Sequence, residues 1–182
     1  MKEKTAWEKY EESELKKVFN LSEEYKEYIS KCKTERECVQ EGIRLAKECG
    51  YVDLEEYIRT GTDLKPGDKV YANNMDKGLA LFLIGERPLE DGLKILGAHV
   101  DSPRLDLKQN PLYEDTDLVL LDTHYYGGIK HYQWVTLPLA IHGVVVKKDG
   151  TKISISIGER DEDPVFGISD LLVHLVGEYI ED

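Results

Sequence analysis

Helical spacing of apolar residues dominates the first third of the chain. Residues 1–20 are charged with scattered apolar positions, which indicates an amphipathic arm or first helix lying against a partner subunit. Ser22, followed by two glutamates, can cap a helix that runs to about Cys32. The segment 34–37, Thr-Glu-Arg-Glu, fits a capping box, and the helix that it opens is expected to stop at Gly50.

Short apolar runs replace the helical spacing after a third, shorter helix that begins at Asp53. Residues 69–72, 79–84 and 93–98 are predicted to be strands. The second of these runs is almost continuously apolar, which is typical of a strand covered on both faces. Helices followed by buried strands indicate an α/β layered domain, with too few strands here to close a large sheet.

The second half of the chain has the character of a small β-rich module. Residues 104–117 are polar and turn-rich. Three segments are then predicted to be strands: 117–122, 134–147 and 152–157. Asp149-Gly150 between the last two is a strong hairpin signal, and isoleucines alternate with polar residues in the last strand, so that one face is wet. Residues 169–181 return to helical spacing.

Charge and composition exclude several classes of function. The chain has 182 residues and a formal net charge of −12, which argues against nucleic acid as a partner. No apolar run approaches the length of a membrane span, and the N-terminus lacks the apolar core of a signal peptide. The three cysteines form no CxxC pair, so reduced thiols in the cytoplasm are expected rather than disulfides.

The most informative stretch is residues 95–103, Ile-Leu-Gly-Ala-His-Val-Asp-Ser-Pro. On an extended backbone, residues i and i+2 point to the same side, so His99 and Asp101 would share one face at the exposed end of a strand. A neutral imidazole is a good zinc ligand, and a nearby carboxylate can fix its tautomer. The alternative is a loop histidine followed by a turn-forming aspartate before a proline, since zinc needs three or four ligands.

Other candidate residues carry weaker signals. His124 and His131 flank a Tyr-Gly-Gly turn and are expected to face solvent, whereas His142 lies in an apolar segment and suits a hydrogen-bonded core or interface position. Aromatic residues gather around the same turn: Tyr125, Tyr126, Tyr132 and Trp134. They could form a wall of a substrate site, although an aromatic cluster in a small β module is more often its core.

Taken together, these motifs are similar to the M18 family of zinc aminopeptidases, the aspartyl aminopeptidase and aminopeptidase I group. The segments that carry the resemblance are Gly97–Pro103, Tyr126–Ile129 with Trp134, Pro138–Val144, Asp163-Pro164 and Ile168–Leu175. Their order and spacing resemble the aminopeptidase I branch over nearly the whole chain.

The resemblance implies an α/β/α peptidase sandwich, begun by residues 1–103, with a β-rich, barrel-like oligomerisation domain, begun by residues 104–182, inserted after the HxD loop. It also implies two zinc ions, removal of N-terminal residues from peptides, and homo-oligomers. On that pattern His99 matches a zinc ligand and Asp101 the carboxylate that orients a ligand imidazole. His174 matches a histidine that reaches a neighbouring subunit's active site; its alternative is an ordinary helix-surface histidine.

The resemblance also shows what this chain does not match. Family members are much longer, and their other metal ligands and catalytic glutamate belong to segments after the inserted domain. This sequence is therefore expected to be an N-terminal portion that is inactive alone. The competing interpretation is a catalytically silent fragment that acts as an oligomerisation or interaction module. The preferred N-terminal residue of a substrate is not encoded in these segments.

Overall fold

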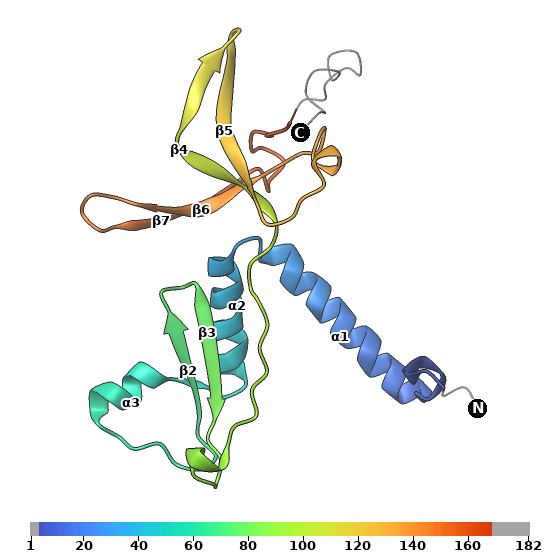
Figure 1. Cartoon of the computed structure of the whole chain (residues 1–182), viewed down its shortest axis with the longest axis vertical. Coiled ribbons are helices and arrows are strands. Elements are labelled where there is room, and N and C mark those ends of the chain that lie inside the picture. The colour runs from blue at the N-terminus through green and yellow to red at the C-terminus, as the bar shows by residue number, and fades with distance from the viewer. Residues whose placement is uncertain (1–3, 169–182) are drawn as a thin grey trace. The chain divides into compact units, whose positions relative to one another are not determined.

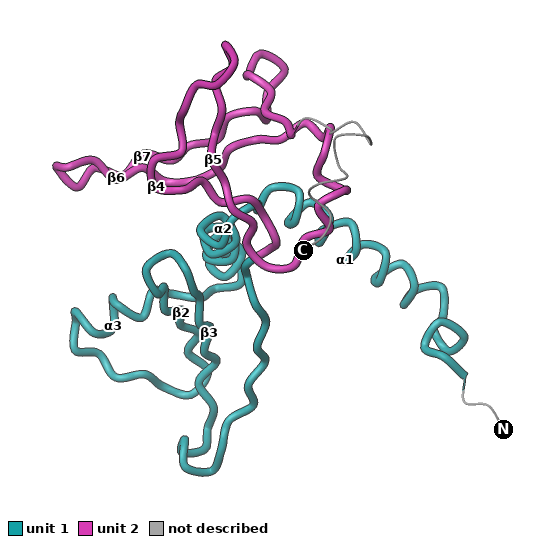
Figure 2. The backbone as a smooth tube through the Cα atoms, turned by 45° about the horizontal axis from the view of Figure 1, so that its top comes forward, with its two compact units in different colours: residues 1–101 teal, residues 102–182 magenta. Residues whose placement is uncertain are grey.

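The computed structural model describes residues 4–168 and divides the chain into two compact units. The first unit comprises residues 1–101 and the second residues 102–182 (Figure 2). Helices and a mixed sheet make up the first unit, and the second is built from β-hairpins (Figure 1). The class of the chain is therefore mixed α/β, as predicted.

Three α-helices belong to the first unit: α1 (Glu12–Lys31), α2 (Glu35–Glu48) and α3 (Leu54–Thr60), preceded by the short 3₁₀ helix η1 (Ala6–Glu8). The predicted capping box at the start of α2 is confirmed. The Glu37 amide donates to Thr34 Oγ1 at 3.4 Å, and Glu37 Oε2 accepts from the Thr34 amide at 2.9 Å. Asp53 caps α3, because its Oδ1 accepts from the Glu55 amide at 3.0 Å.

Helix α1 begins earlier than the sequence pattern predicted. It starts after Glu11, whose amide donates to Glu14 Oε2 at 3.0 Å, and it passes through Ser22 without interruption. Ser22 is therefore an interior residue and not a cap. The apolar positions on both sides of Ser22 share one helical register, and a serine costs little inside a helix that is otherwise well formed.

The sheet of the first unit contains β1 (Val52–Asp53), β2 (Lys69–Asn74) and β3 (Gly78–Leu83) in the order β1-β2-β3. Strand β1 pairs parallel to β2, and β2 pairs antiparallel to β3. Val70 and Tyr71 of β2 and Val39 and Ala46 of α2 are buried, which places the core between this helix and the sheet. A Cβ on Gly42 would lie 2.9 Å from Leu79 Cδ2, so glycine permits this close packing.

Two predictions about strands in the first unit are wrong. Residues 93–98 form no strand, and Ile95 and Leu96 are 80% and 101% exposed. Strand β3 forms, but Leu81, Phe82 and Leu83 are exposed instead of covered on both faces. An apolar run becomes a strand only where another strand offers its backbone amides and carbonyls, and among residues 4–168 none lies beside 93–98.

The second unit contains two separate hairpins. Strand β4 (Arg104–Asp115) pairs antiparallel with β5 (Leu118–Tyr126), and β6 (Ile141–Val146) pairs antiparallel with β7 (Lys152–Ile157). The Asp149-Gly150 turn between β6 and β7 is confirmed, with Gly150 at φ 84°. Residues 104–117 were predicted to be irregular, but most of them form a strand. The sequence pattern missed this strand because a hairpin strand that is largely exposed on both faces carries many polar residues and has no apolar alternation.

The strand predicted from 134 to 147 forms only as β6, from Ile141 to Val146. Residues 127–140, which precede β6, form no named strand. They contain the 3₁₀ helix η3 (His131–Gln133), and isolated bridges join Val135 to Ile168 and Leu139 to Phe166. Asp163 closes the loop after β7, because its Oδ2 accepts from the amides of Gly158 and Arg160, and these bonds hold the pKa of its carboxyl below the usual value. The described hairpins are separate sheets, so a closed barrel stays a prediction.

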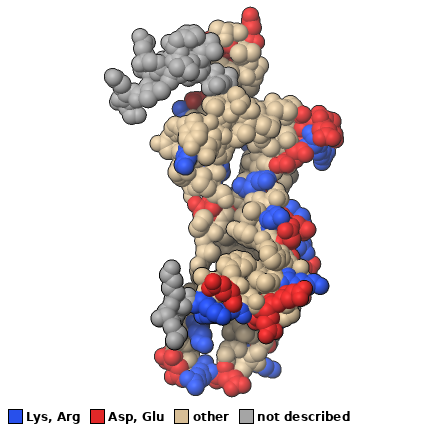
Figure 3. Space-filling model, turned by 90° about the vertical axis from the view of Figure 1, so that its right-hand side faces the viewer, with Lys and Arg blue, Asp and Glu red and all other residues tan. Residues whose placement is uncertain are grey.

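The surface carries both signs of charge. On the face shown in Figure 3, lysine and arginine side chains lie beside aspartate and glutamate and form no continuous basic patch. Within residues 4–168, no helix has both the length and the apolar content that a membrane span requires.

The capping box of α2 gives a direct test of the local fold. Thr34→Ala removes the hydroxyl that accepts from Glu37, so we expect the free energy of unfolding to fall by about 1 kcal/mol. Chemical denaturation of the intact protein followed by circular dichroism measures this change. Thr34→Ser keeps a capping hydroxyl and is expected to unfold like the unaltered protein; equal losses in the two variants would contradict the capping role.

Candidate metal centre

The sequence pattern predicted His99 at the exposed end of a strand, but this residue lies in an extended loop. The segment from Leu93 to Asp101 has no ladder partner among residues 4–168, and the His99 side chain is 83% exposed. The i, i+2 relation nevertheless brings the two predicted residues together. His99 Nδ1 lies 2.8 Å from the backbone oxygen of Asp101 and 3.2 Å from its Oδ1.

The oxygen that Nδ1 faces determines the tautomer of the imidazole. A backbone carbonyl oxygen only accepts hydrogen bonds, so Nδ1 must carry the proton and donate it to Asp101. Nε2 is then the nitrogen with the lone pair, on a ring that is largely open to solvent. Metal-binding histidines commonly use one nitrogen for the ion and give the other N–H to a carbonyl or a carboxylate. The donor arrangement at His99 and Asp101 fits this pattern.

A complete metal site needs more than this pair. Structural and catalytic zinc sites use three or four ligands from the protein. Among residues 4–168, no three histidine, cysteine, aspartate or glutamate side chains are grouped closely enough to hold an ion. The described residues therefore offer one oriented imidazole and no complete metal site. His174, the third predicted site residue, lies outside the described residues.

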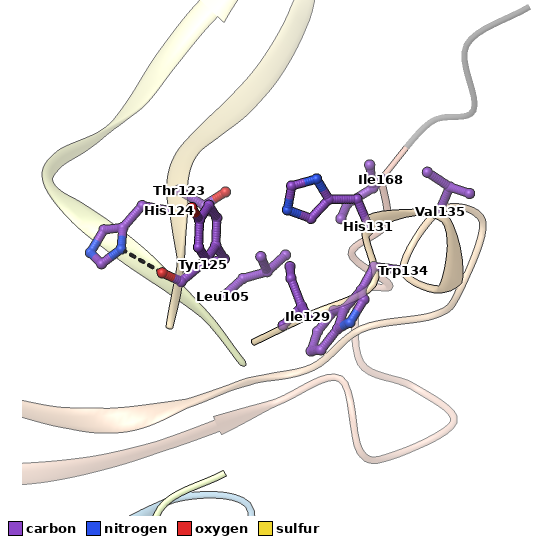
Figure 4. Close-up of a pocket in the computed structure, with 9 residues that line it drawn as sticks. All are labelled: Leu105, Thr123, His124, Tyr125, Ile129, His131, Trp134, Val135 and Ile168. Carbon is purple, nitrogen blue, oxygen red and sulfur yellow. Dashed lines mark hydrogen bonds between the residues drawn. The ribbon is translucent and has the colours of Figure 1, made fainter. Parts of the chain in front are cut away.

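The second unit contains a pocket of about 270 Å³ that the sequence analysis did not predict (Figure 4). Its lining comes from β4, β5 and the segment around η3: Leu105, Thr123, His124, Tyr125, Ile129, His131, Trp134, Val135 and Ile168. The rings of His131 and Tyr125 lie 5.4 Å apart, and His124 Nδ1 donates to the Tyr125 carbonyl at 3.1 Å. The aromatic cluster near the Tyr-Gly-Gly turn was the signal that could have indicated this pocket.

The aromatic residues around the Tyr-Gly-Gly turn do not form a buried core, because Tyr125 and Tyr132 are 59% and 71% exposed. The Tyr126 ring instead lies under the Arg104 guanidinium, 4.0 Å from the ring centroid. His142 is a hydrogen-bonded histidine with a side chain only 10% exposed, as predicted, and its Nε2 lies 2.8 Å from Glu159 Oε1.

Comparisons with known proteins support the resemblance found in the sequence. The family model described as aminopeptidase I zinc metalloprotease (M18) matches residues 28–181. A curated relative from Clostridium acetobutylicum, a probable M18 family aminopeptidase 1, is 65% identical over 178 residues, which cover 98% of this chain and 38% of the relative. A probable M18 family aminopeptidase 1 from Thermotoga maritima is 47% identical over 96% of this chain and 37% of its own length.

Solved structures agree with the sequence comparisons. The crystal structure of aminopeptidase I from Clostridium acetobutylicum matches with a TM-score of 0.82 and 64% identity, covering 100% of this chain and 40% of that one. Aminopeptidase I from Borrelia burgdorferi matches with a TM-score of 0.84 and 44% identity, over 93% and 41% of the two chains. The chain belongs to the M18 family of metallopeptidases. It spans about two fifths of the length of these relatives.

The tautomer of His99 can be measured directly. Because Nδ1 donates to Asp101, we expect the Nδ1–H form to predominate in the metal-free intact protein at neutral pH. Long-range ¹⁵N–¹H correlation spectra of the imidazole distinguish the two forms. Asp101→Ala removes one acceptor and should lower the Nδ1–H population, whereas Asp91→Ala, at an exposed carboxylate elsewhere, should leave it unchanged; a predominant Nε2–H form in the unaltered protein would contradict the geometry.

Proposed function

We propose that the protein carrying this chain is a zinc aminopeptidase that removes N-terminal residues from peptides. The observation that carries the proposal is the His99–Asp101 pair, in which Nδ1 is hydrogen-bonded and the ring is 83% exposed. Membership of the M18 family supports it, because the matching family is described as a zinc metalloprotease. The similar proteins from Clostridium and Thermotoga are named probable aminopeptidases.

Within this proposal, His99 Nε2 holds one of two zinc ions, and Asp101 keeps the imidazole in the tautomer that can bind. When bound, zinc supplies Lewis-acid polarisation of the scissile carbonyl and lowers the pKa of water. Asp101 also restrains rotation of the ring, because the backbone oxygen and Oδ1 both face Nδ1, at 2.8 and 3.2 Å. The remaining ligands and the general base are assigned to the part of the relatives that this chain does not cover.

The domain assignment follows the same proposal. Residues 1–103 begin the α/β peptidase domain, and residues 104–182 begin an inserted β-rich domain that contributes to contacts between copies. His174 is proposed to act in trans, at the active site of a neighbouring subunit. A cytoplasmic location fits the three cysteines, which are all free thiols.

Zinc content and peptide hydrolysis test the proposal together. We expect the intact protein to bind zinc and to hydrolyse aminoacyl chromogenic substrates with a free α-amine, but not their N-acetylated forms. Asp101→Asn should lower zinc affinity about 10- to 100-fold, because it weakens the partner of a ligand imidazole. His99→Ala should lose zinc altogether from one site. Metal analysis after dialysis and competition with a chromogenic chelator measure both effects.

His124→Ala is the matched control for the loss of an exposed imidazole. His124 lies in the second unit, and its Nδ1 also donates to a backbone carbonyl, so its removal should leave the zinc content unchanged. Full zinc content in His99→Ala would exclude His99 as a ligand. Zinc binding without hydrolysis of any free-amine substrate would exclude the peptidase function while keeping the metal site.

A second candidate function for the second unit is association between copies of the protein. The far end of the β4–β5 hairpin exposes apolar side chains that its own hairpin leaves uncovered: Leu112 at 68%, Leu118 at 59% and Val119 at 75%. By the register of the hairpin, Leu112 and Val119 lie on one face and Leu118 on the other, so both faces of this end expose apolar side chains. Exposed apolar surface of this kind commonly marks a contact between proteins. This observation favours a role for the hairpin in a homo-oligomer, and it holds for a catalytically silent fragment as well.

Charge substitution at the hairpin tests the association. Val119→Asp places a carboxylate in the apolar surface, so we expect the molar mass measured by light scattering to fall towards that of one chain. Ser154→Asp adds the same charge at an exposed polar position of the β6–β7 hairpin and should leave the molar mass unchanged. An unaltered mass in Val119→Asp would show that this end of the hairpin lies outside the interface.

A further inference from the structure

The β4–β5 hairpin carries an exposed apolar end and a pocket on the same face. Side chains alternate along β5, so Val119, Thr123 and Tyr125 point to one side. Leu112 lies on that side as well, because it pairs with Leu121 of β5. Thr123 and Tyr125 line the pocket at the base of the hairpin. Val119 and Leu112, near its turn, are 75% and 68% exposed, so one face presents both a projection and a cavity.

The pocket suits apolar side chains better than a separate small molecule. One wall comes from the base of the hairpin, with Leu105 and Tyr125, and the other from the segment around η3, with His131 and Trp134 (Figure 4). Its volume of about 270 Å³ lies below the roughly 300–1,000 Å³ of pockets that enclose a whole ligand. An aliphatic side chain inserted between aromatic walls is a common anchor of protein interfaces.

The turn of a hairpin cannot reach the pocket at its own base. Strand β5 has 9 residues, which span about 27 Å at the usual rise of an antiparallel strand. The ladder with β4 pairs both ends of β5 and keeps them apart. Two hairpins packed face to face in opposite directions, however, bring each turn to the base of the other. A two-fold axis makes both contacts at once and closes the pair.

The charges at the two ends of the hairpin are complementary. Residues 112–119 contain Glu114, Asp115 and Asp117 and no lysine or arginine. The described residues that line the pocket include two histidines and no carboxylate, and the exposed Lys130 lies between two of them in the sequence. An antiparallel pair places the acidic turn beside this base, whereas a parallel pair would oppose carboxylates. Charge therefore favours the antiparallel direction.

The turn itself is tightly defined. Thr116 and Asp117 adopt φ values of 50° and 62°, which are the left-handed values of a two-residue hairpin turn. The Glu114 carboxylate accepts from the Asp117 amide at 3.2 Å and holds the turn closed. The apolar side chains beside the turn are thus held in place before any partner arrives, which lowers the entropy cost of binding.

We propose that the β4–β5 hairpins of two copies pack face to face and antiparallel, so that Val119 and Leu112 of each copy enter the pocket of the other. The contact rests on the association between copies proposed above and adds the face, the direction and the receiving site. It is independent of the metal centre. The opposite face of the same end, which carries Leu118 at 59% exposure, stays outside the contact.

Photocross-linking of the intact protein tests the contact. The residue p-benzoylphenylalanine replaces Val119, the assembled protein is irradiated, and the band with twice the mass of one chain is digested with trypsin. The tryptic peptide 131–147 contains His131, Trp134 and Val135 of the pocket and is separate from the peptide that carries the probe. We expect the probe to be joined to peptide 131–147, because the pocket of the second copy surrounds it.

The same probe in place of Leu118 is the matched control. Leu118 is exposed at the same end but points to the other face, so we expect about tenfold less of the joined peptide. Equal yields from positions 118 and 119 would overturn the proposed face. Double-mass bands in which position 119 is joined to other peptides would overturn the receiving site but keep the association. A single-chain molar mass in light scattering would contradict both.

Charge reversal tests the antiparallel direction. Lys130→Glu places a carboxylate opposite the acidic turn, so we expect the dissociation constant from analytical ultracentrifugation to rise about fivefold. Glu114→Lys, on the face that carries Val119, should weaken association when introduced alone. The two reversals together restore opposite charges and should weaken association less than Lys130→Glu does. A double variant whose loss equals the product of the two single losses would overturn the direction.

Discussion

The contact between Nδ1 of His99 and Asp101 is the interaction on which the proposed metal site depends. An imidazole without a partner exchanges between tautomers and rotates freely, whereas one that donates to a fixed oxygen presents its other nitrogen with the lone pair available. The backbone oxygen and the carboxylate of one residue both lie near Nδ1, so a single short loop supplies both the imidazole and the groups that orient it. The metal-binding role proposed for the first unit depends on this arrangement.

Features that depend on neighbouring residues were predictable from the sequence. The capping box at Thr34, the cap at Asp53 and the Asp149-Gly150 hairpin each involve residues a few positions apart, and each is present. The strand expected at 93–98 and the irregular segment expected at 104–117 depend instead on pairing between distant residues. Apolar content cannot reveal whether a partner strand is available, and a hairpin exposed on both faces has no apolar alternation to detect.

In the candidate site too, a contact between near neighbours in the sequence was predictable, and contacts between distant segments were not. The spacing of His99 and Asp101 predicted their contact, because residues i and i+2 of an extended backbone share one side. The sequence did not predict that the Asp101 carbonyl, and not only the carboxylate, would face the ring. The pocket in the second unit brings Leu105, Tyr125 and Ile168 together from separate segments, and their proximity depends on the folded hairpins, which no local spacing encodes.

The exposed segment from Leu93 to Asp101 has a consequence for handling the molecule. Proteases bind their substrates as extended chains that lack internal hydrogen bonds, and this segment already has that shape among the described residues. Lys94 within it is exposed and suits trypsin. Brief digestion would therefore cut close to the boundary of the two units in the sequence, within the stretch that carries His99 and Asp101.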